Sequence, residues 1–256
     1  MTAGLGYDVH GPDDAPVVVL GSSLGTDRRM WDPQLAVLAQ RFRVVRYDHR
    51  GHGGSEVPTG PYGLADLAQD VLALLDTLGV GRFTAGGLSL GGMVAMHLAA
   101  HVPDRVEKVA LFCTSAHMPP PEGWLDRAAT VRTGGTAAVA DAVVARWFTP
   151  AFAARRPDVV AAHRAMVVGT PAEGYAGCCE AIAAMDLRPA LAKVAAPVLV
   201  VAGTDDPATP PEHARTVAAS LPDDLPCRVE VVPGAHLATV ENPDDCTRLL
   251  LAHLDG

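Results

Sequence analysis

One turn constrains this chain more than any other feature of its sequence. Residues 82–93 read as a short apolar strand, a tight turn and the start of a helix, and residues 87–91, G-L-S-L-G, fit the pattern G-x-S-x-G. In that pattern the serine, here Ser89, occupies a strained backbone conformation that points its hydroxyl out of a sheet. The flanking glycines leave room where the helix passes close to the strand. The turn therefore predicts a nucleophilic serine, and the alternative is a glycine-rich turn with a bystander serine.

The order of the other elements predicts an α/β fold. Apolar strand-like segments alternate with helical segments as far as residue 113, and the alternation resumes at residue 197. This order is typical of a mostly parallel sheet covered by helices on both faces. Only one strand fits before the first central strand, where two are usual, so about seven or eight strands are expected. The expected strands are residues 5–10, 16–20, 42–47, 82–88, 106–113, 197–202 and 227–232.

Residues 117–189 interrupt this alternation. They contain a Pro-Pro-Pro run and alanine-rich helical pieces but no strand-like segment, and aromatic residues such as Trp124, Trp147 and Phe148 gather there. We expect this insertion to form a helical cap over the carboxyl edge of the sheet, where α/β proteins hold their sites. The predicted domains are a core of residues 1–116 and 190–256 and a cap of residues 117–189, inserted after the sixth strand.

Composition and charge exclude several classes of protein. The 256 residues suit one large domain, and the formal net charge of −9 disfavours nucleic acids and anionic membranes as partners. No apolar run approaches the ~18 residues of a membrane span, and residues 1–14 lack the apolar core of a signal peptide. The five cysteines are an odd number without metal-ligand spacing, which indicates reduced thiols. A cytoplasmic protein without a metal site is therefore expected, and its oligomeric state stays open.

A base and an acid follow the serine in the order that such a site requires. Proteins with this turn place the serine first along the chain, then an Asp or Glu, then a His. His236 comes directly after the last predicted strand, and the loop after the strand 197–202 holds Asp205 and Asp206. Neighbouring residues of an extended loop point apart, so only one of these two carboxylates can face the histidine, and Asp206 is the choice. The predicted catalytic residues are Ser89, Asp206 and His236.

Backbone N–H groups should stabilise the negatively charged oxygen that forms during acyl transfer. One donor is expected from Leu90, directly after the serine, and the second from Leu24 in the loop after the first central strand. Ser23, one residue earlier, is the alternative to Leu24. His49 and His52 lie in a loop that packs beside the site, and we predict that they make structural hydrogen bonds.

Several motifs resemble the 3-oxoadipate enol-lactonases of the α/β-hydrolase superfamily, and the resemblance spans almost the whole chain. The serine turn and the histidine segment are common to the superfamily. Narrower motifs are S-S-L-G-T-D at residues 22–27, R-W-F-T at residues 146–149 and G-Y-A-G-C-C at residues 174–179. The chain departs from the family at Ser22, often Asn, and at Leu90, often Met. Both departures are mild because the expected hydrogen bonds come from the backbone.

The resemblance implies the α/β-hydrolase fold and the hydrolysis of a five-membered enol lactone that carries a carboxylate. The product is 3-oxoadipate, in the breakdown of protocatechuate and catechol, and no metal or organic cofactor is required. Ring opening expels an enolate, which is a better leaving group than an ordinary alkoxide. A carboxylated small molecule needs a local cation or hydrogen-bond donor in a protein of net charge −9. The candidate substrate-binding residues are Ser23, Arg127, Arg132, Arg146 and Trp147, with Trp147 the first choice.

Two other kinds of function are compatible with the sequence. The nearest is another carboxylesterase, or a cofactor-free perhydrolase of the same fold that acts on simple esters. A second is a hormone-type receptor that retains the three catalytic residues but works by binding. Such a receptor should present an exposed apolar surface on its cap, and the sequence indicates none. A serine at position 89 argues against haloalkane dehalogenases and epoxide hydrolases, which use aspartate there.

Overall fold

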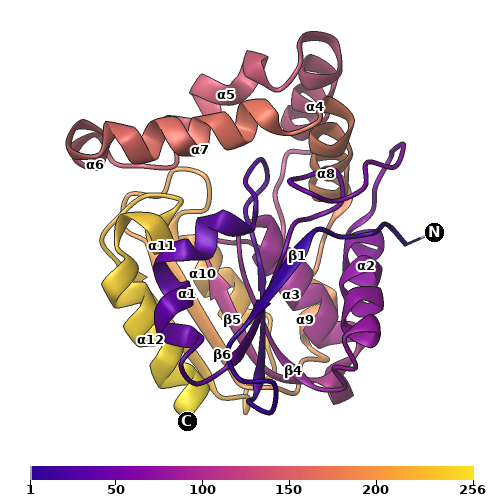
Figure 1. Ribbon diagram of the computed structural model, residues 1–256, viewed down its shortest axis with the longest axis vertical. Helices are drawn as coiled ribbons and strands as arrows, with labels where there is room; N and C mark the ends of the chain where they lie inside the picture. Colours follow the sequence, from indigo (N-terminus) through magenta and orange to yellow (C-terminus); the bar gives the residue numbers. More distant parts are fainter. Residues whose placement is uncertain (1) are drawn as a thin grey trace.

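One mostly parallel sheet forms the centre of the molecule. The structure is a computed structural model that describes residues 2–256, and within these residues seven strands lie in the order β1-β3-β2-β4-β5-β6-β7 (Figure 1). β1 runs antiparallel to β3, and the other neighbours are parallel. The predicted α/β fold is confirmed. The strands are β1 (Tyr7–His10), β2 (Val17–Gly21), β3 (Arg43–Tyr47), β4 (Phe83–Leu88), β5 (Val106–Phe112), β6 (Val198–Gly203) and β7 (Cys227–Val232).

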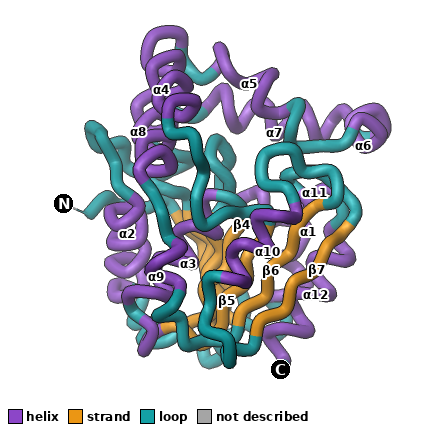
Figure 2. Tube along the Cα trace, turned by 180° about the vertical axis from the view of Figure 1, so that it is seen from behind, coloured by secondary structure: helices purple, strands orange, loops and turns teal. Residues whose placement is uncertain are grey.

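Helices cover both faces of this sheet. α1 and α12 pack together on one face, and α2, α3, α9 and α10 cover the other (Figures 1 and 2). Among the described residues, no helix is long and apolar enough to cross a membrane. The helices of the sheet layers are α1 (Asp32–Leu38), α2 (Leu64–Thr77), α3 (Leu90–His101), α9 (Arg188–Leu191), α10 (Pro211–Ala219), α11 (Ala238–Glu241) and α12 (Pro243–Asp255), with two short 3-10 helices, η1 (Arg28–Trp31) and η2 (Pro103–Arg105).

Sequence periodicity explains how α2 forms and where it ends. Its apolar residues recur every three or four positions and are buried against the sheet. Asp66 begins the helix by accepting a hydrogen bond from the Gly63 N–H at 2.8 Å. Gly79, at a φ of +68°, follows the last turn and lets the chain leave the helix.

The helical insertion between β5 and β6 lies over the carboxyl edge of the sheet (Figure 1). α4 packs against α8, and α7 runs across the top of the molecule. The two chain segments that connect it to the sheet lie side by side, because the Leu187 N–H donates to the Ala116 carbonyl at 2.8 Å. Its helices are α4 (Glu122–Gly134), α5 (Ala137–Val144), α6 (Pro150–Arg155), α7 (Pro157–Gly169) and α8 (Ala172–Ala184).

The insertion follows the fifth strand, so its predicted place after the sixth strand is wrong. The difference arises at the amino end, where residues 2–6 form no strand. The backbone N–H groups of Ala3 and Gly6 donate to the side chains of Asp70 and Ser55, at 2.7 Å and 2.9 Å. These residues therefore satisfy their hydrogen bonds without a neighbouring strand, and the amino end adds only β1 to the sheet.

The turn at Ser89 depends on a very close approach of α3 to β2 and β4. A Cβ atom on Gly91 would lie 2.1 Å from the Gly21 carbonyl oxygen, and one on Gly87 would lie 2.2 Å from the Gly91 carbonyl carbon. Ser89 itself has a φ of +54°, which L-residues rarely adopt. The strained turn predicted from the sequence is thus confirmed. The two glycines remove the side chains that would otherwise hold the helix away from the sheet.

We expect Gly91→Ala to lower the free energy of unfolding by about 1–3 kcal/mol or more, because its methyl group would overlap backbone that cannot move aside. Gly81→Ala is the matched control, since a Cβ there meets nothing within 4 Å. That control should change the free energy by less than about 0.5 kcal/mol. Urea unfolding of both variants measures the difference, and equal stabilities would contradict the packing argument.

Candidate active site

A cavity of about 250 Å³ lies between the carboxyl edge of the sheet and the helical insertion. It is enclosed on the sheet side by the loop after β2, the turn at Ser89 and the loop after β7. The insertion closes it from above with aromatic and cationic side chains. Among the residues that line it are Ser23, Leu24, Ser89, Trp124, Arg127, Arg146, Trp147, Tyr175 and His236.

Ser89 is held rigidly at the end of β4. Its N–H donates to the Phe112 carbonyl at 2.9 Å, and the Thr114 hydroxyl donates to the Ser89 carbonyl at 2.7 Å. Among the described residues, the Ser89 hydroxyl makes no hydrogen bond. The side chain therefore faces the cavity while its backbone is fixed on both sides.

His236 and Asp206 form a buried pair beside this serine. His236 Nδ1 lies 2.9 Å from Asp206 Oδ2, and Asp206 also accepts hydrogen bonds from the Thr209 N–H and hydroxyl, at 3.0 Å and 2.7 Å. An ionised carboxylate only accepts hydrogen bonds, so Nδ1 carries the proton and Nε2 is left with its lone pair. Asp205, in contrast, accepts from the Thr204 hydroxyl at the surface. The structure brings Asp206 to the histidine, and not Asp205.

The surroundings of Asp206 keep it ionised. Burial alone would raise the pKa of its carboxyl group. The positive charge that His236 carries when it is protonated, together with the hydrogen bonds from His236 and Thr209, outweighs burial and lowers the pKa to about 2. The carboxylate can therefore stabilise a positively charged imidazole at neutral pH.

Two buried histidines hold the loop after β2 in place. His49 Nε2 donates to the Ser22 carbonyl at 2.9 Å, and His52 Nε2 accepts from the Gly25 N–H at 3.0 Å. The Gly91 N–H also donates to the Ser22 carbonyl, at 3.0 Å, which ties this loop to the turn at Ser89. The predicted structural role of both histidines is confirmed.

Ser23 and Leu24, two of the residues expected to supply backbone donors, line the cavity, and Leu90 directly follows Ser89. Among the described residues, the N–H groups of Ser23, Leu24 and Leu90 donate no hydrogen bond to another backbone or side-chain group. The next N–H groups in the loop, those of Gly25 and Thr26, are already paired. The donors of Ser23, Leu24 and Leu90 are thus free to bind a ligand oxygen, and the choice between Ser23 and Leu24 stays open.

Two arginines of the insertion line the cavity without an acidic partner. Within the part of the chain that the structure describes, neither Arg127 nor Arg146 has a carboxylate oxygen within 4.0 Å. Burial, and then the charge of Arg127, lower the pKa of Arg146. The Arg127 guanidinium lies over the Trp124 ring, 4.5 Å from its centroid. This part of the cavity is therefore positively charged in a protein of net charge −9.

The other candidates for substrate binding divide into two groups. Ser23 and Trp147 line the cavity, as expected. Arg132 does not, because it forms ion pairs with Glu173, at 2.8 Å, and with Glu180 on the exposed side of α4 and α8. The structure therefore does not bring Arg132 to the cavity that holds Ser89.

Tyr175 is absent from the residues predicted for the site, yet its buried side chain lines the cavity. The signal in the sequence is the motif at residues 174–179, in which a tyrosine follows Gly174. Position 174 requires glycine because the backbone of Gly174 touches that of Gly51. A Cβ atom at position 174 would lie 2.2 Å from the Gly51 carbonyl oxygen. This contact places Tyr175 over the loop after β2.

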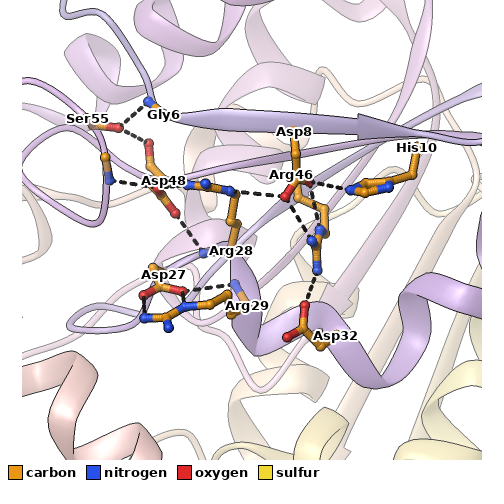
Figure 3. A network of polar contacts seen from close by, with 11 residues as sticks. Gly6, Asp8, His10, Asp27, Arg28, Arg29, Asp32, Arg46, Asp48 and Ser55 are labelled. Carbon is orange, nitrogen blue, oxygen red and sulfur yellow. Dashed lines mark hydrogen bonds and ion pairs between the residues drawn. The ribbon is translucent and has the colours of Figure 1, made fainter.

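A larger cleft of about 470 Å³ lies next to α7, but its charged groups are already paired. Arg28 binds Asp8 at 3.1 Å and also binds Asp48, and Arg46 binds Asp8 at 2.9 Å (Figure 3). Asp48 further accepts from the Arg28 N–H at 2.7 Å. These contacts join β1, β3 and η1, and they support the loop that carries Ser23. The cleft contains no nucleophile paired with a base.

Comparisons with known proteins agree with this geometry. A family model described as "alpha/beta hydrolase fold" matches residues 16–243. The chain is 38% identical to 3-oxoadipate enol-lactonase 2 of Acinetobacter baylyi over 239 residues, which are 93% of this chain and 88% of that protein. It is 34% identical to 3-oxoadipate enol-lactonase 1 of the same organism over 241 residues, 94% of this chain and 89% of that protein.

A solved structure is also very similar. The enol-lactonase from Burkholderia xenovorans superposes with a TM-score of 0.96 at 44% sequence identity, and the match covers 99% of this chain and 97% of that one. The similarity includes the helical insertion, because the aligned region spans nearly the whole of both chains.

We expect acid to destabilise the protein between about pH 6.5 and pH 4. Burial lowers the pKa of His49 to about 3 and that of His52 to about 4, whereas an unfolded histidine titrates near 6.5. In this window the unfolded state binds more protons than the folded state, so the free energy of unfolding falls as the pH falls. Each such histidine contributes up to about 1.4 kcal/mol per pH unit.

Urea unfolding at several pH values measures this slope. His52→Gln removes one of the buried titrating groups and should flatten the slope, although it also lowers stability overall. His101→Gln, which removes an exposed histidine, is the control. An equal change of slope in both variants would show that the buried histidines do not cause the acid sensitivity.

Proposed function

The chain belongs to the 3-oxoadipate enol-lactonase family of the α/β-hydrolases and is a hydrolase of ester bonds, and on this premise we propose that it opens 3-oxoadipate enol-lactone to 3-oxoadipate. The proposed setting is the breakdown of protocatechuate and catechol in the cytoplasm. Residues 1–116 and 190–256 would form the catalytic core, and residues 117–189 the cap that selects the substrate.

Ser89 is the proposed nucleophile. Its oxygen attacks the lactone carbonyl while its proton passes to Nε2 of His236, and Asp206 stabilises the imidazolium. The N–H groups of Leu90 and of Leu24, or Ser23, bind the oxyanion. The ring C–O bond then breaks, the enolate leaves and takes a proton from His236, and an acyl-enzyme forms.

Water completes the reaction. His236 accepts a proton from a water molecule as the water oxygen attacks the acyl carbon, and the bond to Ser89 breaks. The serine regains its proton from the imidazolium, and the acyl group leaves as a carboxylic acid, which ionises after its release. The residues described perform each of these proton transfers themselves.

One observation favours a carboxylated lactone over a neutral ester as the substrate. Arg127 and Arg146 face the same cavity as Ser89, and no acidic side chain of the described residues neutralises them. Two guanidinium groups that repel each other in a half-buried place are stabilised when an anion lies between them. The alternative function is that of a carboxylesterase or perhydrolase of simple esters. Such a substrate carries no carboxylate for the two arginines to bind.

We expect Asp206→Asn to lower kcat by about 10⁴-fold, because an amide in place of the carboxylate no longer holds the reactive tautomer of His236. Asp205→Asn is the matched control, since the side chain of Asp205 faces away from the histidine, and its kcat should change by less than about threefold. Steady-state kinetics with one ester substrate are sufficient. The reverse ranking would assign the acid to Asp205.

The function is tested by following the loss of the enol-lactone chromophore beside a panel of neutral esters. We expect kcat/KM to be highest for the lactone and Ser89→Ala to abolish its turnover, since the triad contributes up to about 10⁶-fold. Arg146→Met should raise KM for the lactone by about 10-fold to 100-fold and leave neutral esters unaffected. Arg132→Gln, which changes an arginine outside the cavity, is the control.

Two outcomes would contradict the proposal. A wild-type enzyme that prefers neutral esters to the lactone would favour the simple esterase. An equal effect of Arg146→Met and Arg132→Gln on KM would show that the cavity arginine does not bind the carboxylate.

A further inference from the structure

Tyr175 carries a buried hydroxyl group without a partner. The side chain is 0% exposed, and among the described residues its oxygen makes no hydrogen bond. A buried hydroxyl that makes no hydrogen bond costs free energy, so such groups are rare in proteins unless a ligand satisfies them. Tyr175 belongs to α8, a helix of the insertion (Figure 1). Its side chain lines the cavity that Ser89 and His236 also line.

The charged neighbours of this hydroxyl determine what it lacks. The guanidinium groups of Arg127 and Arg146 act electrostatically on the Tyr175 hydroxyl, and Arg127 lies near enough to donate toward its oxygen. Guanidinium groups only donate hydrogen bonds, so they can serve the tyrosine oxygen but cannot accept its proton. Burial raises the pKa of Tyr175, which keeps the O–H proton in place. The missing partner is therefore an acceptor.

The ring of Tyr175 is held in a fixed position. It packs on Gly25, where a Cβ would lie 2.9 Å from the ring carbon Cε2. Gly25 is itself fixed by its hydrogen bond to His52. The hydroxyl is thus preorganised, and it does not lose side-chain freedom when a ligand binds.

We propose that the Tyr175 hydroxyl donates a hydrogen bond to the substrate carboxylate that Arg127 and Arg146 attract. A carboxylate supplies several acceptor positions, so it can bind two guanidinium groups and one hydroxyl at the same time. Tyr175 then determines specificity, because a neutral substrate of the same shape would leave its proton unpaired. This inference rests on the proposed carboxylated substrate, but it does not require that the substrate is a lactone.

A pair of chromogenic esters tests the inference separately from the lactone reaction. Nitrophenyl hydrogen glutarate carries a carboxylate at the end of its acyl chain, and nitrophenyl pentanoate ends in a methyl group. We expect Tyr175→Phe to raise KM for the acidic ester by about 10-fold to 100-fold, as the loss of a hydrogen bond to a charged group predicts. KM for the neutral ester and both kcat values should change by less than about twofold.

Thermal unfolding of the same variant gives a second, independent readout. Phenylalanine keeps the ring on Gly25 and removes only the unpaired hydroxyl, so the melting temperature should stay the same or rise. Tyr7→Phe, which removes an exposed hydroxyl on β1, is the matched control for both measurements. It should change neither KM nor the melting temperature.

Each other outcome overturns the inference. A lower melting temperature would mean that the hydroxyl has a structural partner in the protein. An unchanged KM for the acidic ester, or an equal rise for both esters, would mean that the hydroxyl does not bind the carboxylate.

The failure of the proposed function can be told apart from the failure of this inference. An enzyme that cleaves the acidic ester but not the enol lactone would refute the proposed function, and the effect of Tyr175→Phe on the ester pair would still decide the inference.

Discussion

The close contact of α3 with β2 and β4 is the constraint on which the site depends. Gly91 touches the backbone of Gly21, and this contact allows the strained turn that exposes Ser89. The same approach brings the Gly91 N–H to the Ser22 carbonyl, at 3.0 Å. One packing contact thus fixes the position of the nucleophile relative to the loop that carries the proposed oxyanion donors. The turn at Ser89 and the loop after β2 could not shift independently, because their backbones are in direct contact.

The cavity differs from the rest of the protein in that its arginines are not paired with carboxylates. Most arginines of this chain are paired with carboxylates, as Arg28 and Arg46 are in the network under the loop after β2 (Figure 3). Arg127 and Arg146 have no such partner among the described residues, and Tyr175 adds a buried hydroxyl without one. Unpaired polar groups lower the stability of a folded protein. Their concentration in one cavity is what a binding site requires, because the ligand supplies the missing charge.

The fold and the order of the three catalytic candidates were predictable from sequence because both follow from local patterns. Strand and helix periodicities, and a glycine-bounded serine followed by Asp206 and His236, are visible without knowledge of tertiary contacts. The place of the insertion in the strand order was not predictable in this way, since it depends on whether residues 2–6 form a further strand. Sequence also could not separate Arg132 from the two candidate arginines that line the cavity, for a geometric reason. Arg127 and Arg132 lie five residues apart on α4, which rotates them by about 140° around the helix axis. Only the packing of α4 on α8 decides which of the two faces the cavity.

The two sides of the cavity make different demands on a substrate. The sheet side supplies the chemistry of ester hydrolysis, and its elements recur in proteins with many substrates. The insertion side supplies two cations and the hydroxyl of Tyr175, which stands on Gly25 of the loop that also carries Ser23 and Leu24. A molecule that carries both an acyl bond and a carboxylate satisfies both sides at once. Because the same loop supports the ring of Tyr175 and the proposed oxyanion donors, the position of a bound carboxylate is fixed relative to the carbonyl group that Ser89 attacks. Binding energy from the carboxylate can therefore be used to orient the reacting bond, which is how a remote group raises the rate of the chemical step.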